Sequence, residues 1–178
     1  MTAIRPARFS DGAAMAAVHV AAWRSAYAGV LPDHSLTALS ARRQEGYYGH
    51  IIRAGEIVHV AVPSDEEAED GAPDVLGFVT ASRARGTAIA EGEIETLYVL
   101  DDWRDRGLGR ALITAAARGL AEAGCRNVFV WVLSRNHSRW FYERLGGVRA
   151  MEGSVSVGGV QQPQTAFMWD PIDRLTGV

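Results

Sequence analysis

Residues 91–124 constrain the fold most, because a strand pattern, a glycine-containing turn and a helix pattern follow one another there without interruption. Residues 91–100 alternate with a period of two, which predicts a strand. Its two faces are Glu91, Glu93, Glu95, Leu97 and Val99 on one side and Ile94, Thr96, Tyr98 and Leu100 on the other. Small and apolar residues then recur at helical spacing over residues 108–123, and Gly124 ends the helix.

The turn between this strand and this helix has the composition of an anion-binding site. Gly107 and Gly109 allow the backbone to turn sharply and to come close to a ligand. The first four amides of a helix lack partners within it and lie at its positive end. Arg104 and Arg106 add guanidinium groups suited to phosphate oxygens. The sequence therefore predicts that the start of this helix binds phosphate.

The spacing Arg104-x-x-Gly107-x-Gly109, preceded by the strand EIETLYV, resembles the acetyl-CoA signature of the GCN5-related N-acetyltransferase (GNAT) family. It matches neither the Walker loop nor the dinucleotide-binding fingerprint, whose spacings differ. A second block, Asn136 followed by FYERLGG at residues 141–147, is similar to the last helix of the same family. The resemblance is specific over residues 91–147.

The resemblance implies an α/β (α+β) fold that covers residues 1–178 as a single N-acetyltransferase domain. This GNAT-type fold has a mixed, mostly antiparallel sheet of six to seven strands, flanked by about four helices, and a splayed parallel strand pair that binds acetyl-CoA. The near-continuous apolar run at residues 127–133 agrees with this, because it predicts a buried parallel partner for the strand at residues 91–100, joined to it by a right-handed crossover.

The other predicted elements are assigned from periodicity and turn residues. Strands are expected at residues 3–8, 56–62, 74–82, 148–157 and 164–169. Helices are expected from residue 14 until residues 31–33 break the first of them, at residues 33–52 (one short and one longer) and at residues 136–145, with Asn136 as the cap of the last. Residues 63–74 are rich in carboxylates, glycine and proline, which predicts a mobile connection. Whether this acidic connection also attracts a cationic acceptor is left open.

Composition excludes several classes of protein. A chain of 178 residues with 48% apolar and 22% charged side chains can bury a sizeable core. Its net charge of −3 argues against nucleic-acid binding. The sequence has neither the apolar run of a membrane span nor the apolar core of a signal peptide. Its single cysteine, Cys125, excludes an internal disulfide. We therefore expect a cytoplasmic protein. The spacing of its His, Cys, Asp and Glu residues predicts no metal site.

The family resemblance implies how acetyl-CoA is held as co-substrate. Its acyl-pantetheine arm is expected to enter the gap between the splayed strands and to bind backbone groups there, as an added strand would. The residues expected to contact the cofactor are Leu97, Tyr98, Val99, Arg104, Asp105, Arg106, Gly107, Leu108, Gly109, Arg110, Asn136 and Tyr142.

In the implied reaction, an acceptor amine attacks the thioester directly. A lysine-like amine has a pKa of about 10.4, so about one molecule in a thousand is free base at neutral pH, and a carboxylate or an ordered water must take its proton. Glu93 and Glu95, roughly 6.7 Å apart on one strand face, are the candidates, and we favour Glu95 because it lies closer to the gap. The resemblance implies that Tyr142 protonates the leaving thiolate, and an amide near Leu97 or Tyr98 is a candidate oxyanion donor.

The acceptor is expected to be a small-molecule primary amine. A protein N-terminus or lysine side chain is the second acceptor class, and a non-catalytic acyl-CoA sensor is the alternative function. Trp23 and Tyr27 on the first long helix, with His19 nearby, either contact the substrate or pair in the core. The resemblance also implies a possible homodimer through the C-terminal strand hairpin.

Overall fold

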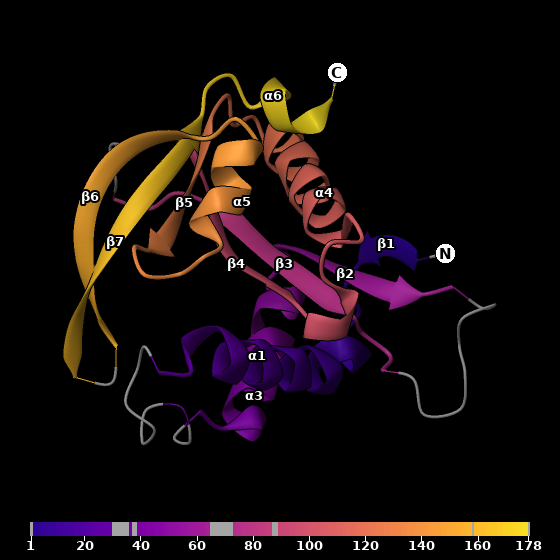
Figure 1. Cartoon of the computed structure of the whole chain (residues 1–178). Coiled ribbons are helices and arrows are strands. Elements are labelled where there is room, and N and C mark those ends of the chain that lie inside the picture. Colours follow the sequence, from indigo (N-terminus) through magenta and orange to yellow (C-terminus); the bar gives the residue numbers. More distant parts are fainter. Residues whose placement is uncertain are drawn as a thin grey trace.

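The computed structural model describes residues 2–29, 36, 39–64, 73–86, 89–157 and 159–177. The strands are β1 (Thr2–Pro6), β2 (Ile57–Pro63), β3 (Gly77–Arg83), β4 (Gly92–Val99), β5 (Val128–Leu133), β6 (Val148–Val157) and β7 (Val160–Trp169). The helices are α1 (Gly12–Tyr27), α3 (Ala41–Arg53), α4 (Leu108–Glu122), α5 (Arg139–Arg144) and α6 (Asp173–Thr176), with 3-10 turns η1 (Phe9–Asp11) and η2 (Asp101–Trp103). Within the described residues, these strands form one sheet in the order β1-β2-β3-β4-β5-β7-β6 (Figure 1).

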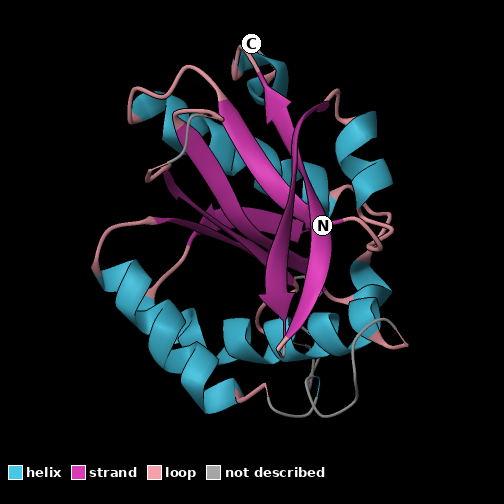
Figure 2. Ribbon diagram, turned by 90° about the vertical axis from the view of Figure 1, so that its left-hand side faces the viewer, coloured by secondary structure: helices cyan, strands magenta, loops and turns pink. Residues whose placement is uncertain are grey.

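This architecture confirms the predicted mixed, mostly antiparallel sheet. Neighbouring strands are antiparallel except for β4 and β5, which are parallel and are joined through α4. Figure 2 shows the strands passing through the middle of the molecule with helices on either side. The predicted strands are all present, although β3 begins only at Gly77. Most of the predicted short helix within residues 33–52 and of the acidic connection at residues 63–74 lies outside the described residues.

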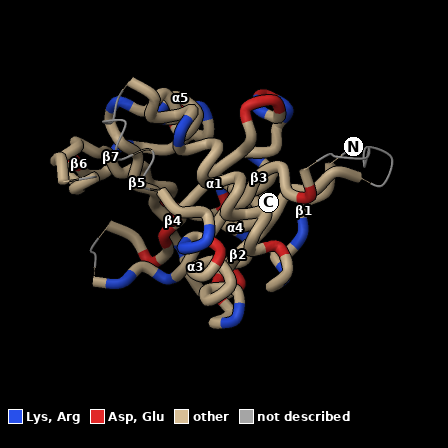
Figure 3. The backbone as a smooth tube through the Cα atoms, turned by 90° about the horizontal axis from the view of Figure 1, so that it is seen from below, with Lys and Arg blue, Asp and Glu red and all other residues tan. Residues whose placement is uncertain are grey.

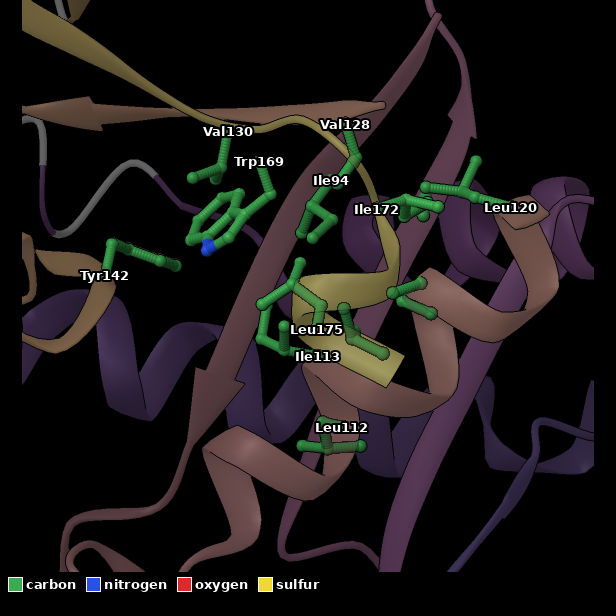
Figure 4. Close-up of a cluster of buried hydrophobic side chains, with 14 of the residues drawn as sticks. Ile94, Leu112, Ile113, Leu120, Val128, Val130, Tyr142, Trp169, Ile172 and Leu175 are labelled. Atoms are coloured by element: carbon green, nitrogen blue, oxygen red, sulfur yellow. The ribbon is translucent and has the colours of Figure 1, made fainter. Parts of the chain in front are cut away.

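An apolar cluster fixes α4 to one face of the sheet. Leu112, Ile113 and Leu120 of α4 are at most 1% exposed and belong to the same cluster as Ile94 of β4 and Val128 of β5. Burial of each such side chain contributes about 1.5–3 kcal/mol. Figure 4 shows these side chains gathered between α4, α6 and the sheet. The first turn of α4 therefore has a well-supported position relative to β4.

Helices α1 and α3 cover the opposite face of the sheet. Met15 and Val18 of α1 and Tyr48 of α3 are buried in one cluster with Val60 of β2 and Phe78 of β3. The sheet therefore separates two apolar layers, with α4 on one side and α1 with α3 on the other. A strand that crosses the middle of the sheet can present groups to both layers.

A β-bulge interrupts β4 in the middle of the sheet. Thr80 of β3 pairs with Thr96, whereas the next residue, Ala81, pairs with Ile94. Glu95 is therefore the extra residue, with no partner of its own in β3. A bulge bends its strand, increases the local twist and shifts the alternation of side chains by one position.

The bulge makes part of the predicted face assignment of β4 wrong. Leu97 and Val99 were expected on the face of the glutamates, but they pack with Ile94 in the apolar cluster beneath α4. Tyr98 was expected beside Ile94, but it packs in the cluster of α1 and α3. The physical reason is the unpaired residue at Glu95, because one inserted residue moves every later side chain to the other face.

The surface carries mixed charge. Figure 3 shows basic and acidic positions interspersed over the described part of the chain, in keeping with a net charge of −3 for the full sequence. None of the helices that the structure describes has both the length and the apolar character needed to cross a membrane. The described ranges also contain no group of three or more His, Cys, Asp or Glu side chains placed to hold a metal ion.

Candidate active site

Strands β4 and β5 pair only at their beginnings and then separate. Their parallel ladder consists of Gly92 with Val128, Glu93 with Phe129, and Ile94 with Val130. Beyond it, residues 131–133 of β5 pair with β7 on the other side, and β4 continues without a partner in β5. The separation begins at the bulged residue Glu95, which bends β4 at this point. The predicted splay is therefore present, and it leaves a gap between residues 95–99 and 131–133.

Two cavities meet at this gap. The smaller one, of about 120 Å³, lies between the separating strands and is lined by residues of both. The larger one, of about 470 Å³, extends from the gap to the start of α4 and to α5. Both are lined by Tyr27, Leu97, Tyr98, Asn136 and Ser138. The two cavities are therefore neighbours, the smaller one in the gap and the larger one above the first turn of α4.

The first turn of α4 presents free amides to the larger cavity. Gly107 caps the helix in the left-handed conformation, with φ of 82° and ψ of −2°, and no side chain caps the helix start. From Gly107 onward, Ala111 is the first residue whose backbone amide has a backbone partner among the described residues. It donates to the Gly107 carbonyl. The amides of residues 108–110 thus have no helical partner. Amides in this arrangement bind anions.

Most residues predicted to contact the cofactor line the larger cavity. They are Leu97, Tyr98, Val99, Arg104, Asp105, Gly107, Gly109, Arg110 and Asn136. Three predicted residues do not line it: Arg106 stacks its guanidinium 4.6 Å from the centre of the Trp103 ring, Leu108 turns into the core, and Tyr142 lines the smaller cavity instead. The backbone amide of Leu108 nevertheless belongs to the free amides at the helix start.

Sequence reasoning missed Trp103, Ser138 and Phe141, which also line the larger cavity. Phe141 has a signal in the sequence, because it begins the FYERLGG block. A Cβ at Gly109 would lie 3.2 Å from Phe141 Cζ, so the glycine allows α4 and α5 to approach closely. No comparable pattern marked Trp103 or Ser138.

Tyr142 is buried where α5 meets the sheet. Its ring stacks on Phe167 and meets Trp169 edge-on, each at 6.2 Å between centroids, and Figure 4 shows the side chain directed toward Trp169. The residue is only 6% exposed, yet it lines the smaller cavity. Burial raises the pKa of Tyr142 above its usual value, and the nearby Tyr27 adds to this rise. Tyr142 is therefore a neutral phenol at physiological pH.

Asn136 does not cap the last helix as predicted. Helix α5 begins at Arg139 with Ser138 in the capping position. The Asn136 carbonyl oxygen, Oδ1, accepts from the Ser138 amide at 2.8 Å, which closes a local turn before the helix. Its amide nitrogen, Nδ2, donates to the Tyr27 hydroxyl at 3.0 Å. Asn136 therefore joins the β5–α5 connection to α1, above the gap.

The two candidate bases lie on the face of β4 that is turned toward α1 and α3. Glu95 lines the smaller cavity, and its Oε1 accepts from the Ser82 hydroxyl at 2.8 Å. Glu93, half-buried opposite Ser82, lines neither cavity. Burial raises the pKa of Glu93, and the charge of Glu95 raises it further. Of the two carboxylates, the structure brings Glu95 to the gap.

The aromatic residues of α1 divide between core and cavity. Trp23 packs against Tyr27 at 4.4 Å between ring centroids, and Tyr27 alone of the two lines the cavities. His19 stacks on Tyr98 at 4.5 Å, and its Nδ1 forms a hydrogen bond of 2.7 Å with the Tyr48 hydroxyl. Burial lowers the pKa of His19 to about 4, so its imidazole is neutral at pH 7.

Comparisons with known proteins agree with this geometry. The model of the acetyltransferase (GNAT) family matches residues 21–147. The chain is 28% identical to the uncharacterized N-acetyltransferase YuaI of Bacillus subtilis (strain 168) over 176 residues, which covers 98% of this chain and 96% of that protein.

Two solved structures illustrate the shared fold. The GCN5-related N-acetyltransferase of Rhodopseudomonas palustris has a TM-score of 0.72 at 23% identity, with 96% of each chain covered. The structure of yncA from Salmonella typhimurium with its cofactor acetyl-CoA has a TM-score of 0.67 at 19% identity, with 96% of this chain and 94% of that chain covered. Because the family model matches well over half of the sequence, and the splayed strands and the free amides of α4 agree with it, the chain belongs to the GNAT family of acetyltransferases, whose co-substrate is acetyl-CoA.

Proposed function

We propose that this acetyltransferase moves the acetyl group of acetyl-CoA directly to a primary amine of a small molecule. The observation that carries the proposal is that two cavities with shared lining residues lie side by side, one in the gap between β4 and β5 and one above the first turn of α4. A single extended cofactor can then place its diphosphate at the helix start and its thioester in the gap. The free amides of residues 108–110 hold the diphosphate, and Arg110 adds positive charge.

The unpaired edge of β4 holds the pantetheine arm. Beyond Ile94, the backbone groups of β4 that face the gap have no partners in β5, so an amide-containing chain can pair with them. Each such hydrogen bond contributes about 1 kcal/mol net, so several of them act together with the diphosphate contacts. In this proposal, one backbone amide of this stretch, at Leu97 or Tyr98, polarises the thioester carbonyl.

The transfer needs one proton to leave the amine and one to reach the sulfur. The amine nitrogen bonds to the carbonyl carbon, and Glu95, directly or through a water, takes the proton that the nitrogen loses. When the C–S bond breaks, its electron pair stays on the sulfur, and the Tyr142 hydroxyl gives the sulfur a proton. Direct attack makes an acetylated enzyme unnecessary. Buried Cys125 follows the C-terminal end of α4, remote from the helix start.

Several finer features belong to the same proposal. Residues 1–178 act as one domain, because one sheet carries both halves of the site. The enzyme works in the cytoplasm, where the free thiol of Cys125 is stable.

The enzyme forms a homodimer through β6, a ten-residue edge strand that exposes Val148, Met151 and Val155. Sedimentation analysis of the wild type and of Met151→Glu would test the dimer, and a monomeric wild type would refute it.

Thiol release from acetyl-CoA tests the function. The full chain is incubated with acetyl-CoA and a panel of polyamines, aminoglycosides, amino acids and unstructured peptides, and free coenzyme A is titrated with a thiol reagent. We expect release with at least one small amine well above the rate without acceptor. Release only with peptides would assign a protein acceptor. Tight binding of acetyl-CoA with no release for any acceptor would support a sensor module instead.

A further inference from the structure

Proton transfer from Tyr142 would leave a negative charge on a buried side chain. If Tyr142 gives its proton to the leaving sulfur, a negatively charged phenolate remains at a site that is only 6% exposed. Burial raises the pKa of this phenol, so loss of its proton is less favourable there than in water. A hydrogen-bond donor directed at the phenolate oxygen would offset that cost.

The hydrogen bonds of Asn136 exclude one direction for the hydrogen of the Tyr27 hydroxyl. The oxygen Oδ1 of Asn136 accepts from the Ser138 amide at 2.8 Å, which assigns the other end of the side chain as nitrogen. That nitrogen, Nδ2, can only donate, and it lies 3.0 Å from the Tyr27 oxygen. The Tyr27 oxygen is therefore an acceptor in this bond, and its own hydrogen must be directed elsewhere.

The Tyr27 hydroxyl shares a cavity with the Tyr142 side chain. Both tyrosines line the space of about 120 Å³ between β4 and β5, Tyr27 from the end of α1 and Tyr142 from α5. Tyr27 is itself 7% exposed, and burial raises its pKa, so it keeps its proton at neutral pH. No described residue accepts a hydrogen bond from the Tyr27 hydroxyl.

We propose that Tyr27, oriented by Asn136, is a positioning residue that donates a hydrogen bond to the Tyr142 oxygen as Tyr142 protonates the thiolate of coenzyme A. The proton of Tyr142 moves to the sulfur, the C–S electron pair becomes the S–H bond, and the negative charge passes to the Tyr142 oxygen. The proton of Tyr27 stays on its own oxygen. Solvent later returns a proton to Tyr142 and removes the one that Glu95 has taken. This inference rests on the proposed transfer reaction.

The test is a double-mutant cycle on thiol release with an acceptor found for the wild type. Tyr27→Phe should lower kcat about tenfold and leave the KM for acetyl-CoA within about twofold, because the ring remains in place and one hydrogen bond to a charged group is lost. In the Tyr142→Phe background, Tyr27→Phe should have little further effect, since its partner is gone. Equal kcat for Tyr27→Phe and the wild type, or effects that multiply in the double mutant, would overturn the proposal.

A polarity change at Asn136 gives a second readout. Asn136→Asp keeps the shape of the side chain, but its carboxylate can only accept, so the Tyr27 hydroxyl would turn its hydrogen toward it and away from Tyr142. Its kcat should fall further than that of Asn136→Ala, and this extra loss should shrink in the Tyr27→Phe background. An extra loss of the same size in both backgrounds would reflect the added charge alone and would contradict the orientation by Asn136.

Tyr48→Phe is the matched control. Tyr48 is a buried tyrosine whose hydroxyl is hydrogen-bonded to His19, and it lines neither cavity. Its removal should cost stability, as Tyr27→Phe does, but should leave kcat close to wild type. A wild type that releases no thiol with any acceptor, or a Tyr142→Phe variant with full activity, would refute the proposed reaction. An effect of Tyr142→Phe without any effect of Tyr27→Phe would refute only the role of Tyr27.

Discussion

Gly107→Ala tests whether the backbone amides at the start of α4 bind coenzyme A. Its effect on the affinity for coenzyme A can be compared with its effect on stability. Gly107 has φ of 82°, in the left-handed region that residues with a Cβ rarely adopt. A Cβ there would meet no atom within 4 Å, so alanine fits without a clash and its cost is conformational. That cost is about 1 kcal/mol of the free energy of unfolding.

The same substitution should weaken coenzyme A binding by more than its strain suggests. Alanine relieves its strain by rotating the peptide that leads into α4, and this turns the free amides of residues 108–110 away from the diphosphate. A hydrogen bond to a charged group contributes about 1.5–3 kcal/mol, so the loss of one raises the Kd of coenzyme A about ten- to a hundredfold.

Gly55→Ala is the matched control for this prediction. Gly55 has φ of 76°, and a Cβ added there would also meet no atom within 4 Å, but this glycine follows the end of α3 and lines neither cavity. Urea unfolding should give both variants a similar loss of stability, and calorimetric titration should give weaker coenzyme A binding for Gly107→Ala alone. Wild-type affinity in Gly107→Ala, with the expected loss of stability, would refute binding by these amides.

The remaining predictions concern the base, a buried histidine and the approach of α5. Glu95→Gln should lower kcat/KM at least about tenfold near pH 7 and remove the acidic limb of the pH–rate profile, whereas Ser82→Ala, which removes the hydroxyl that donates to Glu95 and leaves the carboxylate in place, should act more weakly. Folding lowers the pKa of His19 to about 4, so between pH 4 and about 6.5 only the unfolded chain takes up a proton at His19. The free energy of unfolding should therefore fall as the pH drops through this range, by roughly 2 kcal/mol after solvent screening. Urea unfolding at pH 5 and 7 should reveal this dependence in the wild type and lose most of it in His19→Asn. Gly109→Val should destabilise the fold by about 1–3 kcal/mol in thermal unfolding, because its Cβ would lie 3.2 Å from Phe141 Cζ.

The sequence predicted those parts of the fold that depend on local pattern. The helix at residues 108–123 and the apolar strand at residues 127–133 were predicted correctly, because helical periodicity and burial on both faces each produce a recognisable pattern of apolar residues. The bulge at Glu95 produces no such pattern, because an extra residue can be recognised only from the pairing of β4 with β3. The faces of Leu97 and Tyr98 were therefore assigned wrongly.

The candidate site shows the same division. Arg104, Gly107 and Gly109 are close in sequence, so their spacing alone predicted a common site, and all three line the larger cavity. The bond between Tyr27 and Asn136 joins residues that are 109 positions apart. Such a contact is set by how α1 lies across the sheet, so a pattern within either segment could not predict it.

A crystal structure with coenzyme A bound tests the central claim most directly. The account predicts the diphosphate within hydrogen-bonding distance of the amides of residues 108–110, and the pantetheine arm between residues 95–99 of β4 and 131–133 of β5, with its sulfur close to Tyr142. A cofactor bound elsewhere, with β4 and β5 closed onto each other along their length, would contradict it.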